Sequence, residues 1–295
     1  MEAAERFSCA SFAKTFEVQC SCFESGGAAD GTVEAVWGSS LYSGERHMVR
    51  ASSVIFPYLR WAGGDARTRP NTSGLAAGAS RQGAIIAALC ELIERDAVSR
   101  FFEGERPCAV DLSELADPTT RHLLEVFKQH GIELFVADLS SFAYAPTFKA
   151  FAIDTTTQQT HLAVTGQACH PDARVALRKT LLEVAQARAT AIQASREDFR
   201  RHRLAWGARY AELRESFDYV QRLLSQPPRA AMLGSIAPEQ PVSLDRLLGS
   251  LANRFREVIA VDLTHVELAV PVIRVVVPGL ADTFIGHSRE DRHVS

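Results

Sequence analysis

Residues 122–140 of the chain read HLLEVFKQHGIELFVADLS, and residues 246–264 read RLLGSLANRFREVIAVDLT. The two stretches align without a gap, and the matched pairs include Leu123 with Leu247, Leu124 with Leu248, Asp138 with Asp262, and Leu139 with Leu263. Each copy then continues through a proline into an apolar segment, APTFKAF or VPVIRVV. A unit of helix, strand and strand is therefore predicted twice. We expect an α+β fold of internally duplicated helix-strand-strand units, with helices covering one face of mixed sheets.

The spacing of apolar residues and the capping residues predict the other elements. Helices are expected at residues 2–14, 80–102, 117–130, 172–194 and 243–255. Strands are expected at residues 33–37, 47–56, 132–139, 148–154, 161–167, 258–263 and 270–277. The highly charged residues 195–226 predict a solvated helix. We expect all of residues 1–295 to form a single domain.

Composition excludes several classes of protein. With 295 residues, 46% of them hydrophobic and 23% charged, the chain is an ordinary globular protein and not a disordered or fibrous one. A net charge of -3 gives no electrostatic reason to expect nucleic acid as a partner. The sequence contains neither an apolar run of membrane-spanning length nor a signal peptide. The six scattered cysteines indicate reduced thiols, and we expect a cytoplasmic protein.

Three segments place acidic or amide side chains at helical spacing. They comprise Glu2, Glu5 and Arg6; Glu91, Glu94 and Arg95; and Glu183, Gln186 and Arg188. Positions three apart lie on the same helix face, and carboxylates beside apolar neighbours need neutralisation. An intrahelical pair such as Glu91 with Arg95 would suffice for one motif. If all three converge, their carboxylates suit Mg²⁺ and their arginines suit phosphate.

The loop NTSGLAAG at residues 71–78 precedes the predicted helix 80–102. A helix N-terminus with free backbone N–H groups is a ready anion site. By itself this signal is weak, since the loop lacks the Lys-Ser/Thr ending of a P-loop.

Three blocks of this sequence resemble, in order, the most characteristic blocks of the YcaO-domain family. They are TSGLAAGASRQGAIIAALCELIERDA, HPDARVALRKTLLEVAQARATAIQASRED and VDLTHVELAVPVIRVVVPGL, and the N-terminal EAAERF resembles the end of that family's first acidic helix. The resemblance implies an ATP-dependent enzyme that phosphorylates a peptide-backbone amide oxygen. Its members make azolines, thioamides or amidines in ribosomally synthesised peptides, or modify proteins.

Transferred position by position, the resemblance implies ligands for ATP and Mg²⁺. The nucleotide-binding residues would be Glu2, Glu5, Arg6, Glu91, Glu94, Arg95, Lys179, Glu183, Gln186 and Arg188. Of these, Glu5, Glu91, Glu94 and Glu183 would bind the metal. No residue stands out as a general base. His170, in the segment ACHPD, is interpreted as a capping or packing residue.

Some positions depart from the family pattern. Ala76 replaces a usual Ser, Gly83 replaces a usual Glu, Ala87 occupies a frequently polar position, and the chain begins just before Glu2, apparently without the usual N-terminal segment. Two hypotheses follow: an enzyme that gives an azoline by cyclodehydration or a thioamide, or a degenerate subunit that binds precursor peptide or scaffolds a partner enzyme without ATP turnover. The expected partners are a precursor peptide and a peptide-docking or sulfur-delivery protein, and a homodimer is allowed; membrane and nucleic acid are not expected.

Overall fold

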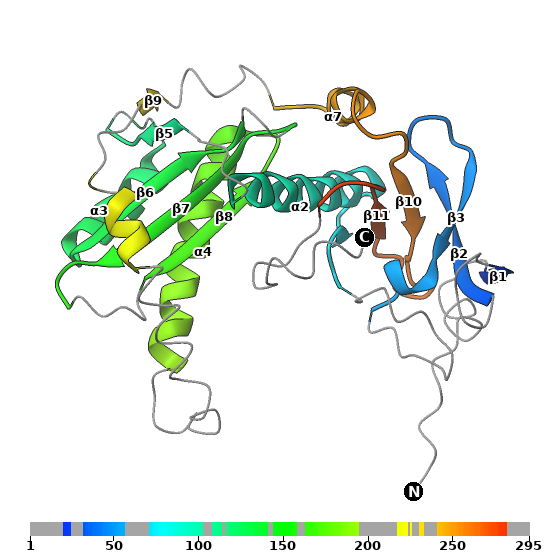
Figure 1. The fold of residues 1–295 in the computed structure, drawn as a ribbon, viewed down its shortest axis with the longest axis horizontal. Helices are drawn as coiled ribbons and strands as arrows, with labels where there is room; N and C mark the ends of the chain where they lie inside the picture. Colours follow the sequence, from blue (N-terminus) through cyan, green and yellow to red (C-terminus); the bar gives the residue numbers. More distant parts are fainter. Residues whose placement is uncertain are drawn as a thin grey trace, which may run out of the picture. The chain divides into compact units, whose positions relative to one another are not determined.

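The structure is a computed structural model of the whole chain. It describes residues 20–24, 32–56, 71–102, 108–113, 115, 117–140, 144–157, 163–194, 217–223, 225, 230–232 and 241–281. The predicted helix at residues 2–14 lies outside them. The chain divides into two compact units (Figure 1): unit 1 holds Met1–Arg95 and Leu244–Ser295, and unit 2 holds Asp96–Ser243.

Unit 2 is built on a five-stranded sheet with the order β8-β7-β6-β5-β9. Its strands are β5 (Cys108–Asp111), β6 (Ile132–Asp138), β7 (Thr147–Asp154), β8 (Val164–Cys169) and β9 (Ala230–Met232). Neighbouring strands are antiparallel except β5 and β9, which are parallel, so this sheet is mixed as predicted. The helices α3 (Pro118–Gln129) and α4 (Ala173–Ala194) pack against it.

The residues predicted to begin and end these helices do so. The Asp117 carboxylate accepts a hydrogen bond from the Thr120 N–H at 3.0 Å and so caps α3. Gly131, with a φ of 65°, follows the helix in the left-handed conformation that glycine adopts readily. The Asp172 carboxylate accepts from the Arg174 N–H at 2.8 Å at the start of α4. The expected helices 117–130 and 172–194 are thus confirmed.

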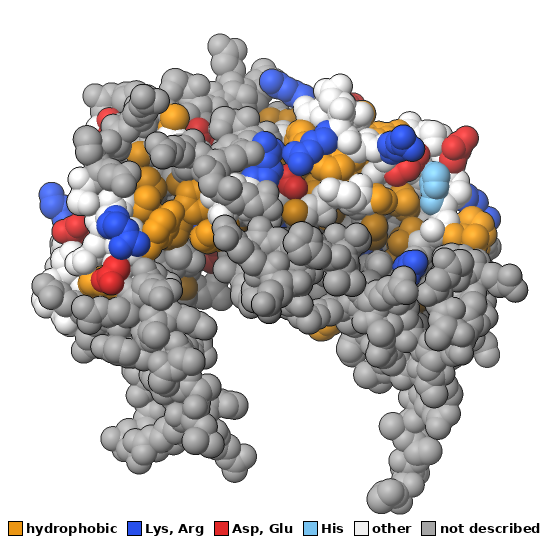
Figure 2. All heavy atoms as spheres, in the orientation of Figure 1, with side chains coloured by type: hydrophobic (Ala, Val, Ile, Leu, Met, Phe, Trp, Pro, Cys, Tyr) orange, Lys and Arg blue, Asp and Glu red, His pale blue; other side chains and the backbone are white. Residues whose placement is uncertain are grey.

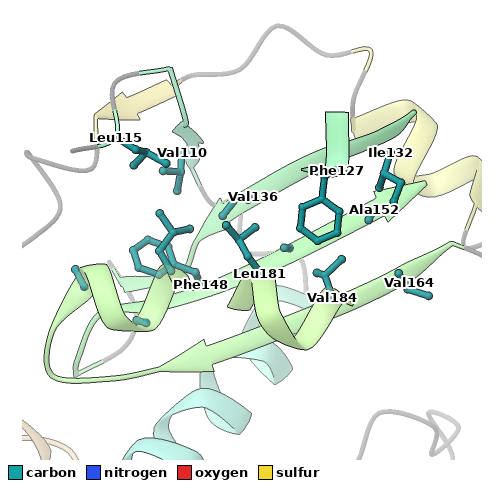
Figure 3. Packing of buried hydrophobic residues seen from close by; sticks show 14 residues of the cluster. Val110, Leu115, Phe127, Ile132, Val136, Phe148, Ala152, Val164, Leu181 and Val184 are labelled. Carbon is teal, nitrogen blue, oxygen red and sulfur yellow. The ribbon is translucent and has the colours of Figure 1, made fainter. Parts of the chain in front are cut away.

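The central strand β7 is buried on both faces. Phe148 and Ala152 point toward α3 and α4, where they meet Leu181 and Val184 of α4 (Figure 3). The alternate residue Phe151 lies on the opposite face and packs with other apolar side chains, namely Phe101, Phe217 and Val220.

Two expectations are corrected by this core. Helical residues cover both faces of this sheet and not one, which is why every residue of β7 is buried. The described end of the stretch 195–226 is helical at residues 217–223, but it is not simply solvated, because Phe217 and Val220 are buried.

Unit 1 contains a six-stranded sheet whose described pairs are all antiparallel. The order is β1-β2-β10-β11-β4, and β3 also pairs with β2. The elements are β1 (Cys20–Glu24), β2 (Thr32–Ser40), β3 (Arg46–Arg50), the 3-10 turn η1 (Ala51–Ser53), β4 (Leu75–Ala77), α2 (Arg81–Phe102), α7 (Leu244–Ala252), β10 (Ile259–Asp262) and β11 (Val272–Val276). The last residues of α2 belong to unit 2. The strand expected at 47–56 ends earlier, at Arg50, where η1 begins.

The predicted duplication is present. In unit 2 the order α3-β6-β7 matches α7-β10-β11 in unit 1, and each strand pair is antiparallel. The register agrees too, since Asp138 pairs with Phe148 and Asp262 pairs with Ile273.

The correspondence extends further than the sequence alignment. The sheet orders β8-β7-β6-β5 and β4-β11-β10-β2 match strand for strand. In each unit the outer strand of this set, β8 or β4, leads into a helix of 22 residues, α4 or α2. In unit 1 this strand and helix come before the repeated segment, and in unit 2 they follow it. The two units are therefore permuted copies of one arrangement.

On the face shown in Figure 2, acidic and basic side chains of the described residues intermingle. None of the helices in the described part of the chain combines the length and apolarity that a membrane span requires.

Candidate functional site

Glu91 lies on α2 and is held from two sides. One carboxylate oxygen accepts a hydrogen bond from the Gly74 backbone N–H at 3.0 Å, and the other accepts from Arg95 Nη2 at 2.8 Å. The Glu91 side chain keeps 30% of its surface exposed. A carboxylate has further lone pairs beyond these two contacts, so it can still bind a cation.

The backbone at Gly74 requires glycine. Its φ is 77°, and a Cβ atom there would lie 2.5 Å from the Val275 carbonyl oxygen and 2.9 Å from the Leu92 side chain. This close approach brings the Gly74 N–H to Glu91 and fixes the loop before β4.

The same loop is held by Arg274 of β11, which is 4% exposed. Its guanidinium donates to the Asn71 carbonyl oxygen at 2.9 Å and to Asn71 Oδ1 at 3.1 Å. Asn71 Oδ1 also accepts from the Ser73 N–H at 2.9 Å. Sequence reasoning missed Arg274 and Asn71, although one arginine within the apolar strand VIRVV was a visible signal.

Glu94 and two of the positions that depart from the family pattern, Gly83 and Ala87, lie on the more open side of α2, whereas Ala76 lies on β4. Glu94 is half-buried, and Ala87 and Gly83 are exposed. Helical geometry places these three on one stripe. Among the described residues, a Cβ at Gly83 would meet Ser80 Oγ alone, at 3.2 Å, so a larger side chain requires a small shift of the Ser80 hydroxyl.

Glu183 of α4 is the counterpart of Glu91, at the same position counted from the start of its helix. Its carboxylate accepts a hydrogen bond from the Gln167 backbone N–H of β8. Glu183, Gln186 and Lys179 are exposed and lie on one face of α4, since they are three and four positions apart.

Arg188 faces the sheet instead. Its Nη2 donates to Asp154 Oδ2 at 2.7 Å, and its Nη1 is buried with no hydrogen-bond partner among the described residues. Burial raises the pKa of Asp154, but the N–H groups of the following turn and the Arg188 guanidinium outweigh it, and the net pKa lies below its usual value. The Asp154 carboxyl is therefore ionised at neutral pH.

His170 lies before α4 in the role expected of it. Its Nδ1 accepts from the Asp172 backbone N–H at 3.0 Å, which places the proton of the neutral ring on Nε2. Burial, with the charge of Lys179 next, lowers the pKa of His170.

The ten residues expected to bind nucleotide fall into three groups. Unit 1 brings Glu91, Glu94 and Arg95 together on α2, and unit 2 carries Lys179, Glu183, Gln186 and Arg188 on α4. Glu2, Glu5 and Arg6 lie outside the described residues. Within the described ranges, no three His, Cys, Asp or Glu side chains are grouped as a metal site. Convergence of the three motifs stays a prediction.

Fold and residues together define an α+β protein of two permuted units, each presenting a glutamate on the helix that follows its outer strand. A family model described as a YcaO cyclodehydratase that binds ATP and Mg²⁺ matches residues 9–281. The chain belongs to the YcaO family, as its sequence blocks predicted. The fold class is confirmed, and so are ATP and Mg²⁺ as the cofactors.

Three similar proteins illustrate this relation. An uncharacterized protein of Methanothermobacter thermautotrophicus is 33% identical over 276 residues, which cover 91% of this chain and 71% of that protein. The structure of YcaO from Methanopyrus kandleri bound with AMPPCP and Mg²⁺ is 26% identical, with a TM-score of 0.59 over 84% of this chain and 64% of that one. The Escherichia coli microcin synthetase McbBCD complex with pro-MccB17 bound matches with a TM-score of 0.59 at 15% identity, over 84% of this chain and 65% of that one, and shows the fold alone.

Proposed function

We propose that the chain activates a backbone amide of a ribosomally synthesised peptide in an ATP- and Mg²⁺-dependent reaction that gives an azoline or a thioamide. The observation that supports this most is the pair Glu91 and Glu183. Both belong to the sequence blocks of the family, and each stands at the same place in one of two equivalent units.

The side chains fit the cofactors in their chemistry. Glu91, Glu94 and Glu183 offer the hard oxygen ligands that Mg²⁺ prefers, and Arg95 and Lys179 supply positive charge for phosphate oxygens. Bound Mg-ATP would supply the phosphoryl group that turns the amide oxygen into a leaving group.

The residues of the chain would hold and orient the groups that bind Mg-ATP. The hydrogen bonds from Gly74 and Gln167 fix one oxygen of Glu91 and of Glu183, so that neither carboxylate has to be ordered when a cation binds. Arg95 is held by Glu91 and only 17% exposed, so its guanidinium is also preorganised. A protein catalyses phosphoryl transfer mainly by positioning the reactants and by neutralising the charge on the phosphate oxygens.

Substitution of the two glutamates tests this proposal. Glu91→Gln and Glu183→Gln keep an acceptor for the backbone N–H but lose the charge, so Mg-ATP affinity measured by calorimetry should fall at least about 10-fold. Glu125→Gln on the exposed side of α3 is the matched control and should bind as wild type does. Unchanged affinity in both site variants would refute the assignment.

The partners follow from the same proposal. The E. coli microcin synthetase relative is a complex that holds pro-MccB17. For this chain we propose a precursor peptide and a peptide-docking or sulfur-delivery protein as partners, with self-association into a homodimer as one arrangement. Reconstitution with the candidate peptide, followed by mass spectrometry, separates loss of water in an azoline from replacement of oxygen by sulfur in a thioamide.

A second candidate is a degenerate subunit that binds peptide without ATP turnover. The observation that favours it is Gly83, because this position on the open stripe of α2 carries no carboxylate. Gly83 is exposed, and its closest described neighbour is the Ser80 hydroxyl, so Gly83→Glu should fold and should tighten Mg-ATP binding if the site is merely weakened. Absence of binding in both forms, with folded and partner-bound protein, would favour the degenerate subunit.

A further inference from the structure

Among the described residues, each unit has a buried cation at the same place in its sheet. In unit 1, Arg274 of β11 pairs across the strands with Leu75 of β4. In unit 2, Lys149 of β7 pairs with Gln167 of β8. Both cations therefore lie on the strand beside the one that leads into the glutamate-bearing helix.

These cations are buried well beyond what is usual for their residue types. Arg274 is 4% exposed and Lys149 is 1% exposed. Lys149 Nζ also lies 5.5 Å and 5.3 Å from the ring centroids of Phe102 and Phe151. Burying a charge costs free energy. The presence of a buried cation at equivalent positions of both units therefore indicates a role that an apolar residue would not fill.

Each cation binds the segment that in turn holds the site glutamate. The Arg274 guanidinium takes two oxygens of Asn71, and the loop that starts there delivers the Gly74 N–H to Glu91. Lys149 Nζ donates to Gln167 Oε1 at 2.8 Å, and the Gln167 backbone N–H binds Glu183.

We propose that Arg274 and Lys149 are equivalent positioning residues for Glu91 and Glu183. The inference rests on the proposed function, because it gives these glutamates the task of binding Mg-ATP. Each cation immobilises the residue or loop whose N–H group orients the carboxylate. Outer partners of this kind commonly change metal affinity about 10- to 100-fold when they are removed.

The test uses the full-length protein and five variants. Arg274→Lys keeps the charge and loses the two-point contact, Lys149→Met keeps the length of the side chain and removes the charge, and Gln167→Met keeps the backbone N–H. Lys149→Met combined with Gln167→Met completes a double-mutant cycle. Thr180→Val is the control, because Thr180 is buried between α4 and β7 and its hydroxyl bonds the carbonyl oxygens of Ala176 at 2.9 Å and Phe148 at 3.5 Å, neither of which holds Glu183.

Two readouts are needed. The first is Mg-ATP affinity by calorimetry, expected to fall about 10-fold or more in each site variant and less than about 2-fold in the control. The double variant should lose no more affinity than either single one, since both act on the same contact. The second is amide hydrogen exchange without nucleotide, in which the Gly74 N–H should exchange faster in Arg274→Lys and the Gln167 N–H faster in Lys149→Met.

The outcomes keep the two proposals apart. If wild type binds Mg-ATP and the folded site variants bind it as tightly, the positioning roles are overturned, whatever the exchange data. If wild type does not bind Mg-ATP, the proposed function fails, and unchanged exchange at Gly74 and Gln167 then overturns the positioning roles as well. Should Lys149→Met not fold, Gln167→Met and Arg274→Lys carry the test.

Discussion

Replacement of Asp154 by Asn should destabilise unit 2 strongly. Asp154 ends β7 and is 2% exposed. One of its oxygens accepts the N–H groups of Thr156 and Thr157 at 3.0 Å and 2.8 Å, and the other accepts from Arg188 at 2.7 Å. An asparagine can keep the turn with its carbonyl oxygen, but its NH₂ group then meets the guanidinium, donor against donor.

The structure sets the size of the effect. Breaking a buried ion pair from one side costs about 3–5 kcal/mol, because the remaining charge is buried without compensation. The Arg188 side chain retains 19% exposure, so water relieves part of this cost and we expect a loss of about 3 kcal/mol. With an unfolding entropy of about 2.1 cal/mol/K per residue, that corresponds to a Tm lower by about 5 °C for a chain of 295 residues.

Urea unfolding of wild type and Asp154→Asn at several pH values measures this loss. The pKa of Asp154 is lowered in the folded state, so its contribution to stability is complete above the unfolded pKa of about 4 and disappears as the pH falls through the folded pKa. The gap between the two proteins should therefore be constant near neutrality and shrink in acid.

A matched variant makes the result interpretable. Asp111→Asn alters a carboxylate that accepts the Ser113 N–H at 2.9 Å on an exposed turn, and should lower the stability much less than Asp154→Asn does. The reasoning is refuted if Asp154→Asn costs no more than this control, or if its gap to wild type is the same at pH 3 as at pH 7.

Three smaller predictions concern single positions. Gly166→Ala should destabilise by about 1–3 kcal/mol in urea unfolding, because its Cβ would lie 2.4 Å from the Thr180 carbonyl oxygen in α4. Gly249→Ala on helix α7 should instead stabilise by about 0.5–1 kcal/mol, since no atom of the described residues lies within 4 Å of a Cβ there. Burial lowers the pKa of His170, so protonation favours the unfolded state, and the stability of the wild type should rise with pH up to about 6.5. His170→Asn should remove this rise in stability, and equal pH profiles for both proteins would contradict the prediction.

Much of the fold followed from local signals in the sequence. Asp117, Gly131 and Asp172 mark helix ends through side-chain and backbone preferences that need no tertiary information. The burial of Phe217 and Val220 was not visible in the same way. A high content of charged residues shows that one face of a helix is exposed to solvent, but it does not show which residues pack against the core.

The sequence suggested the glutamates of the candidate site, whose role in binding stays a prediction, but not the residues that hold them. Glu91 and Glu183 stand in motifs with helical spacing and in recognisable blocks. Arg274 and Lys149 act across strand pairs, with partners far away in the sequence. Such pairing depends on sheet order and register, which one sequence does not specify.

The permuted order of the two units explains why only part of the duplication was found by alignment. A comparison along the chain finds α3-β6-β7 and α7-β10-β11 because their order is the same, but β4-α2 precedes its repeat and β8-α4 follows. The structural match shows where the units differ: the counterparts of Glu94 and Arg95 on α2 are Gln186 and Ala187 on α4. Unit 1 thus carries two carboxylates and a paired guanidinium where unit 2 carries one carboxylate and an amide. Because carboxylates are the ligands that Mg²⁺ prefers, we expect the α2 segment of unit 1 to attract a cation more strongly than the α4 segment of unit 2.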